Sequence, residues 1–141
     1  MSDTSRSQSR VASFFEFDKH DTDAKTEVVA GVTTFLTMSY IIVVNPAILS
    51  AAISIEGYSD GQVFQMLAIT TILAAAVGSM VMALYANRPF GLAPGMGLNA
   101  YFAFTVVIAL GIPWQTALAA VFVEGVVFIA MSRVGARRYI I

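Results

Sequence analysis

One nine-residue stretch, PFGLAPGMG from Pro89 to Gly97, is dominated by residues that leave backbone hydrogen-bonding groups without helical partners. Five of the nine residues are glycine or proline. Proline lacks an N–H donor and clashes with the preceding turn, and glycine costs roughly 1 kcal/mol relative to alanine in a helix. The 13 residues that follow, Leu98–Leu110, are compatible with a helix, but it would rise only about 20 Å, less than the roughly 30 Å of a bilayer core. The sequence therefore predicts an extended stretch followed by a half-helix.

The start of this half-helix has groups that could bind a ligand. A helix that begins near Leu98 presents four unpaired N–H groups and the positive end of its dipole, which suit a carbonyl oxygen or an anion. Broken helices of this kind mark the substrate site of many secondary transporters. The alternative is a kinked helix that packs closely through its glycines. Asn99 could cap the half-helix or contact a ligand, and capping is the commoner role.

Glu124 is the second unusual residue, because it lies in the apolar stretch VFVEGVVF. An ionised carboxylate at the centre of a membrane helix costs about 2.5 to 3.5 kcal/mol. The side chain must therefore face a cavity, pair with a donor, or stay protonated. Two interpretations remain open. Glu124 is either a coupling site that carries a proton or holds a cation, or a buried carboxyl that is hydrogen-bonded to a neighbouring helix.

Residue types argue against an enzyme, a cofactor or a metal. Gly95, Gly97 and Ala100 match the spacing of a dinucleotide-binding fingerprint, but that motif requires a βαβ unit and an acidic residue about 20 positions further on. The chain has no cysteine, and its one histidine, His20, lies outside the apolar runs. No nucleophile or metal-ligand constellation is present in the sequence.

The elements that must position these residues are apolar and long. Hydrophobic residues make up 57% of the 141 residues, charged residues only 12%, and the net charge of -1 indicates no nucleic-acid partner. The mean hydropathy is +0.76. Three stretches carry no charge over 28, 27 and 35 residues: 28–55, 61–87 and 89–123. A helix needs about 20 apolar residues to cross a bilayer. We therefore predict an all-α polytopic membrane protein with four crossings, at about 27–52, 62–86, 90–110 and 115–132.

Residues 1–27 are expected to form a cytoplasmic leader, and a fifth span is expected to start after residue 138. The leader is Ser-rich and polar at first, and its Phe14, Phe15 and Phe17 could form an amphipathic segment or simply an aromatic anchor. The transmembrane domain would occupy 28–141 and be incomplete. Within it, Asn45 of the first span and the small-residue row Ala75, Ser79 and Ala83 of the second are interpreted as packing.

The basic residues predict the topology. With four crossings, every lysine and arginine falls on one side of the membrane, as the positive-inside rule requires of the cytoplasmic face. These residues are Arg6, Arg10, Lys19, Lys25, Arg88, Arg133, Arg137 and Arg138. The opposite loops contain Glu56 and Asp60 in one case, and the turn 111–114 in the other. The N-terminus is therefore expected in the cytoplasm.

Two strings of the sequence resemble a known family. TTFLTMSYIIVVNPAILS (Thr33–Ser50) and NRPFGLAPGMGLNAYFAFTVV (Asn87–Val107) are similar to the opening spans of the nucleobase:cation symporter-2 superfamily, specifically its AzgA-like branch of guanine, hypoxanthine and adenine permeases. The likeness runs from about Phe14 to the end of the chain. It implies about fourteen spans in two inverted seven-span repeats, with a third span made of a short strand plus a half-helix.

The resemblance also implies a site. Backbone and side chains at the start of the half-helix, namely Gly97, Leu98, Asn99 and Ala100, would help to hold the nucleobase. The family's other substrate-binding and proton-linked acidic residues lie mostly in later spans, around the eighth and tenth, which this sequence does not include. Glu124 matches no position of the family's signature.

The sequence thus predicts the N-terminal part of a secondary active transporter of purine nucleobases in the plasma (inner) membrane. Symport with a cation, in the first place H⁺, is expected. The expected partners are a purine nucleobase, the coupling cation, membrane lipid and the remaining spans of the full-length transporter, and a homo-oligomer is left open. Two alternatives are an anion transporter or channel of the same broken-helix fold, and a non-transporting fragment or assembly subunit.

Overall fold

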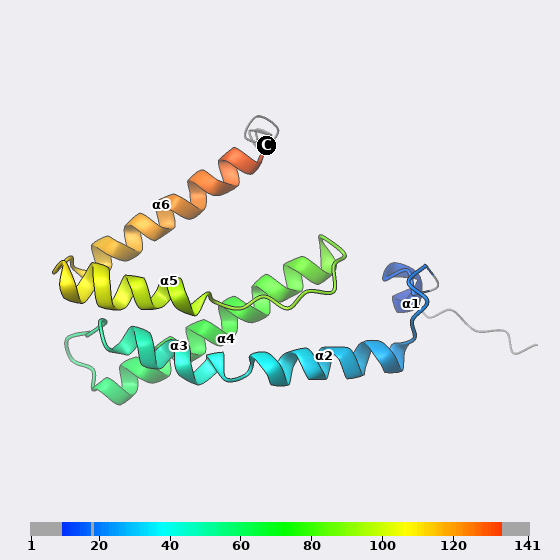
Figure 1. Cartoon of the computed structure of the whole chain (residues 1–141), viewed down its shortest axis with the longest axis horizontal. Helices are drawn as coiled ribbons and strands as arrows, with labels where there is room; N and C mark the ends of the chain where they lie inside the picture. The colour runs from blue at the N-terminus through cyan, green and yellow to red at the C-terminus, as the bar shows by residue number, and fades with distance from the viewer. Residues whose placement is uncertain (1–9, 18, 134–141) are drawn as a thin grey trace, which may run out of the picture.

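The computed structural model describes residues 10–17 and 19–133, and this part of the chain is helical without strands (Figure 1). Three stretches are long and apolar enough to cross a membrane: Ala24–Ser50, Asp60–Leu84 and Trp114–Arg133. The prediction of an all-helical membrane protein is therefore confirmed. In chain order the elements are α1 (Arg10–Phe14), α2 (Ala24–Met38), α3 (Ile41–Ser50), α4 (Asp60–Leu84), α5 (Met96–Ala100), the π-helix η1 (Tyr101–Ala109) and α6 (Trp114–Arg133).

The first apolar stretch is two helices, α2 and α3, that meet at Ser39 and Tyr40. Asp23 caps α2 by accepting a hydrogen bond from the Thr26 N–H at 2.8 Å. At the other end of α2, the Ser39 hydroxyl donates to the Leu36 carbonyl at 2.9 Å, and such back-bonding bends helices. Pro46, which lacks the N–H that would bond one turn back, lies inside α3. The interruption therefore precedes the proline by more than a turn.

The second apolar stretch is the single helix α4. It begins at a capping arrangement in which the Ser59 N–H donates to the Gln62 side-chain oxygen at 2.9 Å. It then continues to Leu84 without interruption. Its 25 residues give a rise of about 37 Å, enough to cross a bilayer core.

After α4 the chain is non-helical up to Gly95 and lies stretched out alongside α4 (Figure 1). Helix then resumes in α5 and continues directly into η1, so the short helix covers Met96–Ala109. The nine residues of η1 have the wider turn of a π-helix, which the sequence did not predict. The glycines and prolines thus break the third apolar stretch where the sequence indicated, although the extended part is not paired as a strand.

A small core lies at one end of the molecule, on the left in Figure 1, where the loop after α3 meets the turn between η1 and α6. Its buried side chains come from that loop and from α4, η1 and α6: Ile53, Val63, Phe102, Ala103 and Ala117. The Trp114 indole N–H donates to the Ser54 carbonyl at 3.1 Å and joins the two loops. Both loops that are free of basic residues therefore lie together.

The opposite end contains the start of α2 and the turn after α4, whereas α6 ends above the middle of the view (Figure 1). Lys25 and Arg88 are at the first two positions, and Arg133 ends α6. Nearby, the Asn87 side-chain amide donates to the Phe14 carbonyl at 3.4 Å and ties the short helix α1 to the turn. In the same region the Lys19 ammonium donates to the Glu16 carboxylate at 2.8 Å. This hydrogen bond, together with the charge of Lys19, holds the pKa of Glu16 below its ordinary value.

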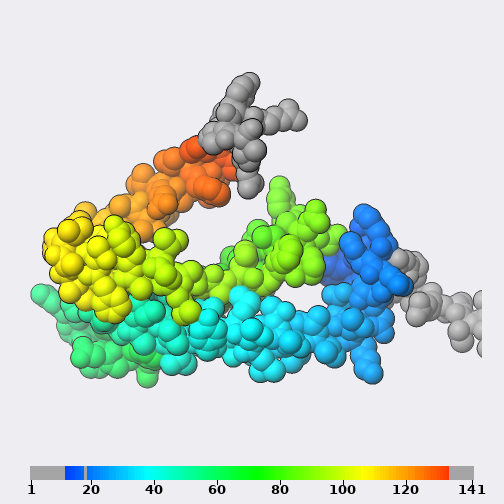
Figure 2. Space-filling view, viewed as in Figure 1, coloured from blue at the N-terminus to red at the C-terminus, as the bar shows by residue number. Residues whose placement is uncertain are grey.

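Helix α6 diverges from the other helices and packs near its start, against η1 and the small core (Figure 2). Among its residues only Ala117 is buried. Large apolar side chains along α2, α4 and α6 are exposed as well, including Phe35, Leu73 and Phe128. Surfaces of this composition suit lipid or further membrane helices.

Candidate functional site

The predicted site residues are the first turn and a half of the short helix. Gly95 precedes it, and Gly97, Leu98, Asn99 and Ala100 lie within α5. The side chain of Leu98 is 77% exposed, and a Cβ added at Gly97 would meet no atom within 4 Å. No side chain caps this helix. Because the helix starts at Met96, Asn99 stands inside the first turn, and the prediction that Asn99 caps the helix is wrong.

The Asn99 side chain instead bonds across to the first crossing. Its amide N–H donates to the side-chain oxygen of Asn45 on α3. The Asn45 amide N–H donates in turn to the Thr71 hydroxyl on α4 at 2.9 Å, and the Thr71 hydroxyl donates to the Leu67 carbonyl at 2.7 Å. One chain of hydrogen bonds therefore links α5, α3 and α4.

We call this chain of hydrogen bonds, from Thr71 through Asn45 to Asn99, the relay. It is buried at Asn45 and Thr71 and more open at Asn99. Asn45 is 3% exposed and Thr71 is 5% exposed, whereas Asn99 is only partly buried. Asn45 uses both ends of its amide within the relay. The side-chain oxygen of Asn99 accepts no hydrogen bond within residues 10–17 and 19–133. A fixed amide with a free acceptor suits a ligand that carries N–H donors.

Sequence reasoning placed Asn45 among packing residues and did not single out Thr71. The two are separated by 26 positions, so no local spacing relates them. A signal was nevertheless present, because an amide inside a charge-free membrane segment must find a partner or bind something. Thr71 could be identified as the partner of Asn45 only once the packing of α3 against α4 was known.

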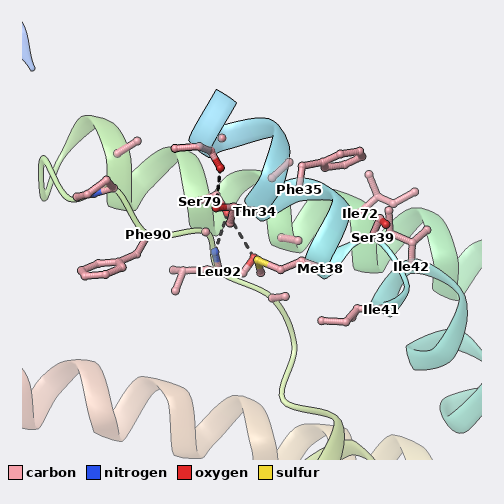
Figure 3. Close-up of a pocket in the computed structure, with 18 of the residues that line it drawn as sticks. Thr34, Phe35, Met38, Ser39, Ile41, Ile42, Ile72, Ser79, Phe90 and Leu92 are labelled. Atoms are coloured by element: carbon pink, nitrogen blue, oxygen red, sulfur yellow. Dashed lines mark hydrogen bonds between the residues drawn. The ribbon is translucent and has the colours of Figure 1, made fainter. Parts of the chain in front are cut away.

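A groove of about 520 Å³ lies beside this region, between α2, α4 and the stretched segment (Figure 3). Its lining is largely apolar and includes Phe35, Met38, Ile72 and Leu92, with Glu27 and Arg88 also among the lining residues. Ser79 contributes a hydroxyl that bonds to the backbone of Leu92. None of the predicted site residues 97–100 lines it.

Glu124 stands apart from the relay. It lies midway along α6, and its side chain is exposed. In the part of the chain that the structure describes, Glu124 makes no hydrogen bond or ion pair, including none to the half-helix. The structure therefore does not bring the two sequence-predicted sites together.

Comparison with known proteins places the chain among permeases. Residues 25–141 match a family described as the Permease family. The chain is 51% identical over 115 residues to the adenine permease AdeP of Escherichia coli, covering 82% of this chain and 24% of that protein. It is 49% identical over 112 residues to the adenine permease AdeQ of the same organism, covering 79% and 23%.

A relative from a second organism is also a purine permease by name. The guanine/hypoxanthine permease PbuO of Bacillus subtilis is 49% identical over 129 residues, which cover 90% of this chain and 28% of that protein. The chain thus spans about a quarter of the length of these curated relatives. The resemblance to purine permeases and the expectation of a non-enzyme are confirmed. This chain, with its long apolar helices and broken third segment, belongs to the Permease family, whose members are membrane-embedded transporters rather than enzymes.

Proposed function

We propose that the protein containing this chain transports purine nucleobases across the plasma membrane. Relatives that match most of the chain are named as adenine permeases and guanine/hypoxanthine permeases. Purines carry N–H donors together with ring-nitrogen or carbonyl acceptors. Such a ligand can donate to the free Asn99 oxygen and accept from the N–H groups at the start of the half-helix.

The observation that carries the proposal is the relay from Thr71 through Asn45 to Asn99. It fixes the orientation of one amide at the start of the half-helix, where Gly97 leaves space. Pre-organised polar groups beside an open space are what a small-ligand site requires. Gly97, Leu98, Asn99 and Ala100 form one wall of the site in this proposal, and other spans form the remainder.

The same proposal includes the arrangement of the spans, their orientation and the coupling ion. The four crossings form the first part of one of two inverted repeats, with the basic end in the cytoplasm and the nucleobase near the midplane. Transport is coupled to a cation, H⁺ in the first place, and Glu124 is the candidate coupling group of this chain.

The test is uptake of radiolabelled adenine, guanine and hypoxanthine by cells that lack their own purine permeases and express the complete reading frame. Uptake of at least one purine is expected, competed by the others. Asn99→Ala and Gly97→Leu should lower uptake by at least tenfold while the protein still reaches the membrane. Ser50→Ala is a control, because the Ser50 hydroxyl bonds only within α3.

Two outcomes would contradict the proposal. Normal uptake by both Asn99→Ala and Gly97→Leu would refute the site. If purines fail to compete and inorganic or organic anions are taken up, the protein is an anion transporter and not a purine permease.

A further inference from the structure

A single hydroxyl pairs both backbone polar groups of Leu92 in the middle of the stretched segment. The Leu92 N–H donates to the Ser79 hydroxyl oxygen at 2.8 Å, and the Ser79 hydroxyl lies 3.3 Å from the Leu92 carbonyl, to which it donates (Figure 3). In the described structure, residues 91–94 make no other hydrogen bonds. Non-helical backbone at membrane depth needs such partners, because no water replaces them.

Two glycines, Gly91 in the segment and Gly78 on α4, allow close packing next to Leu92. A Cβ added at Gly91 would lie 3.1 Å from the Met38 sulfur and 3.2 Å from the Thr34 methyl carbon on α2. A Cβ added at Gly78 on α4 would lie 3.5 Å from the Leu92 Cβ. Gly91 therefore lies against α2, and Leu92 lies against α4 with 40% of its surface exposed. Packing limits movement toward either helix, and the Ser79 hydrogen bonds oppose sliding along α4.

Ser79 and the relay together hold the start of the half-helix at two points on α4. Thr71 and Ser79 are eight residues apart on that helix, which is a rise of about 12 Å. Ser79 fixes Leu92, and Thr71 fixes Asn99 through Asn45. The segment between Leu92 and Asn99 contains the proposed substrate-binding residues Gly97 and Leu98. Its position therefore depends on both attachments.

We propose that Ser79 is a positioning residue, which sets the place of the half-helix along α4 and thereby the affinity for substrate. This inference rests on the proposed function. Without the hydroxyl, the N–H and C=O of Leu92 have no partner, and the segment shifts to find others. The shift moves Gly97 and Leu98 relative to the rest of the site, so the Michaelis constant (KM) rises.

The experiment compares Ser79→Ala, Ser79→Thr and Thr70→Ala in the complete protein. Thr70 is a matched control on the same helix, because its hydroxyl is exposed and bonds only to the Met66 carbonyl. The readouts are KM for purine uptake and the maximal rate per membrane-inserted molecule. Ser79→Ala should raise KM at least tenfold, whereas Ser79→Thr and Thr70→Ala should stay within twofold of wild type.

A KM of Ser79→Ala within twofold of wild type would overturn the inference, and so would a lower maximal rate at unchanged KM. If Ser79→Ala does not reach the membrane, Ser79→Cys takes its place. Its thiol is only a weak donor and acceptor, so its KM should rise at least threefold, and an unchanged KM overturns the inference.

A second measurement does not depend on the substrate. A Cβ at Gly95 meets no atom within 4 Å, so Gly95→Cys, in a background without other cysteines, reports the position of the segment through its rate of reaction with a thiol reagent. Adding Ser79→Ala should change that rate at least threefold, and adding Thr70→Ala should not. Absence of purine uptake by the wild-type protein contradicts the proposed function, whereas an unchanged labelling rate contradicts the role of Ser79.

Discussion

At the scale of residues, Asn45 is the centre of the described polar network. It lies on α3, accepts from Asn99 and donates to Thr71, so one buried amide holds two other segments. Inside a membrane protein, a buried amide without partners costs several kcal/mol relative to water. The network therefore constrains which arrangements of α3, α4 and α5 are stable.

Replacing Asn45 with Ala should release Asn99 and lower stability. The two lost hydrogen bonds are expected to reduce the free energy of unfolding by about 1–2 kcal/mol, and KM for purines should rise because the Asn99 amide is no longer oriented. Thermal unfolding in detergent and purine uptake measure the two effects. Ser50→Ala should change neither, and wild-type KM in Asn45→Ala would show that Asn45 does not position Asn99.

Replacing Glu124 with Gln tests coupling. The neutral amide keeps the shape but cannot release a proton or balance a cation, so uptake by Glu124→Gln should lose most of its dependence on external pH. Initial uptake rates between pH 5.5 and 8 measure this. Glu56→Gln, in the exposed loop after α3, is the control. Retention of the wild-type pH profile by Glu124→Gln would assign Glu124 a purely structural role.

At the scale of elements, the break in the third apolar segment could be predicted because its causes are local. Glycine and proline disfavour the interior of a helix, and four of the five in this stretch precede Met96, where the short helix begins. The partners of Asn99 and Ser79 could not be predicted, because they depend on how α3 and the stretched segment lie against α4. The interruption at Ser39 and Tyr40 could not be predicted from residue type either, because hydroxyls that bond back to the helix also occur at Thr33, Thr34 and Thr37 within unbroken α2.

Gly91 and Gly95 should respond differently to the same change. Gly91→Ala brings a methyl group against Met38 and Thr34, at 3.1 and 3.2 Å, and such overpacking typically costs about 1–3 kcal/mol. Gly95→Ala meets open space and should leave stability nearly unchanged. Thermal unfolding in detergent measures both. Adding Thr34→Ser to Gly91→Ala removes one of the two contacts and should restore part of the loss. Equal stability of the two single variants would refute close packing of Gly91 against α2.

At the scale of the whole molecule, the placement of basic residues distinguishes the two ends. Lys25 and Arg88 occur at one end, and the loop between α3 and α4 at the other end contains Glu56 and no basic residue. The sequence predicts that all basic residues lie on one side of the membrane, because this follows from counting four crossings. The positive-inside rule predicts that the end with the basic residues faces the cytoplasm.

Single cysteines test this orientation in intact cells. The chain contains no cysteine, so Glu56→Cys and Lys25→Cys can each be made in a background from which any others are removed. A membrane-impermeant maleimide should label Glu56→Cys from outside and Lys25→Cys only after permeabilisation. The reverse pattern would invert the proposed topology.

The small core between the loop after α3 and the start of α6 has a consequence for how the chain is made. Ile53 and Val63 come early in the chain, whereas Trp114 and Ala117, which pack with them, come from the start of α6. A ribosome releases the chain from the N-terminus onward, so the earlier helices enter the bilayer before their packing partners exist. Their insertion therefore cannot depend on α6, and the cluster closes only when this last described helix emerges.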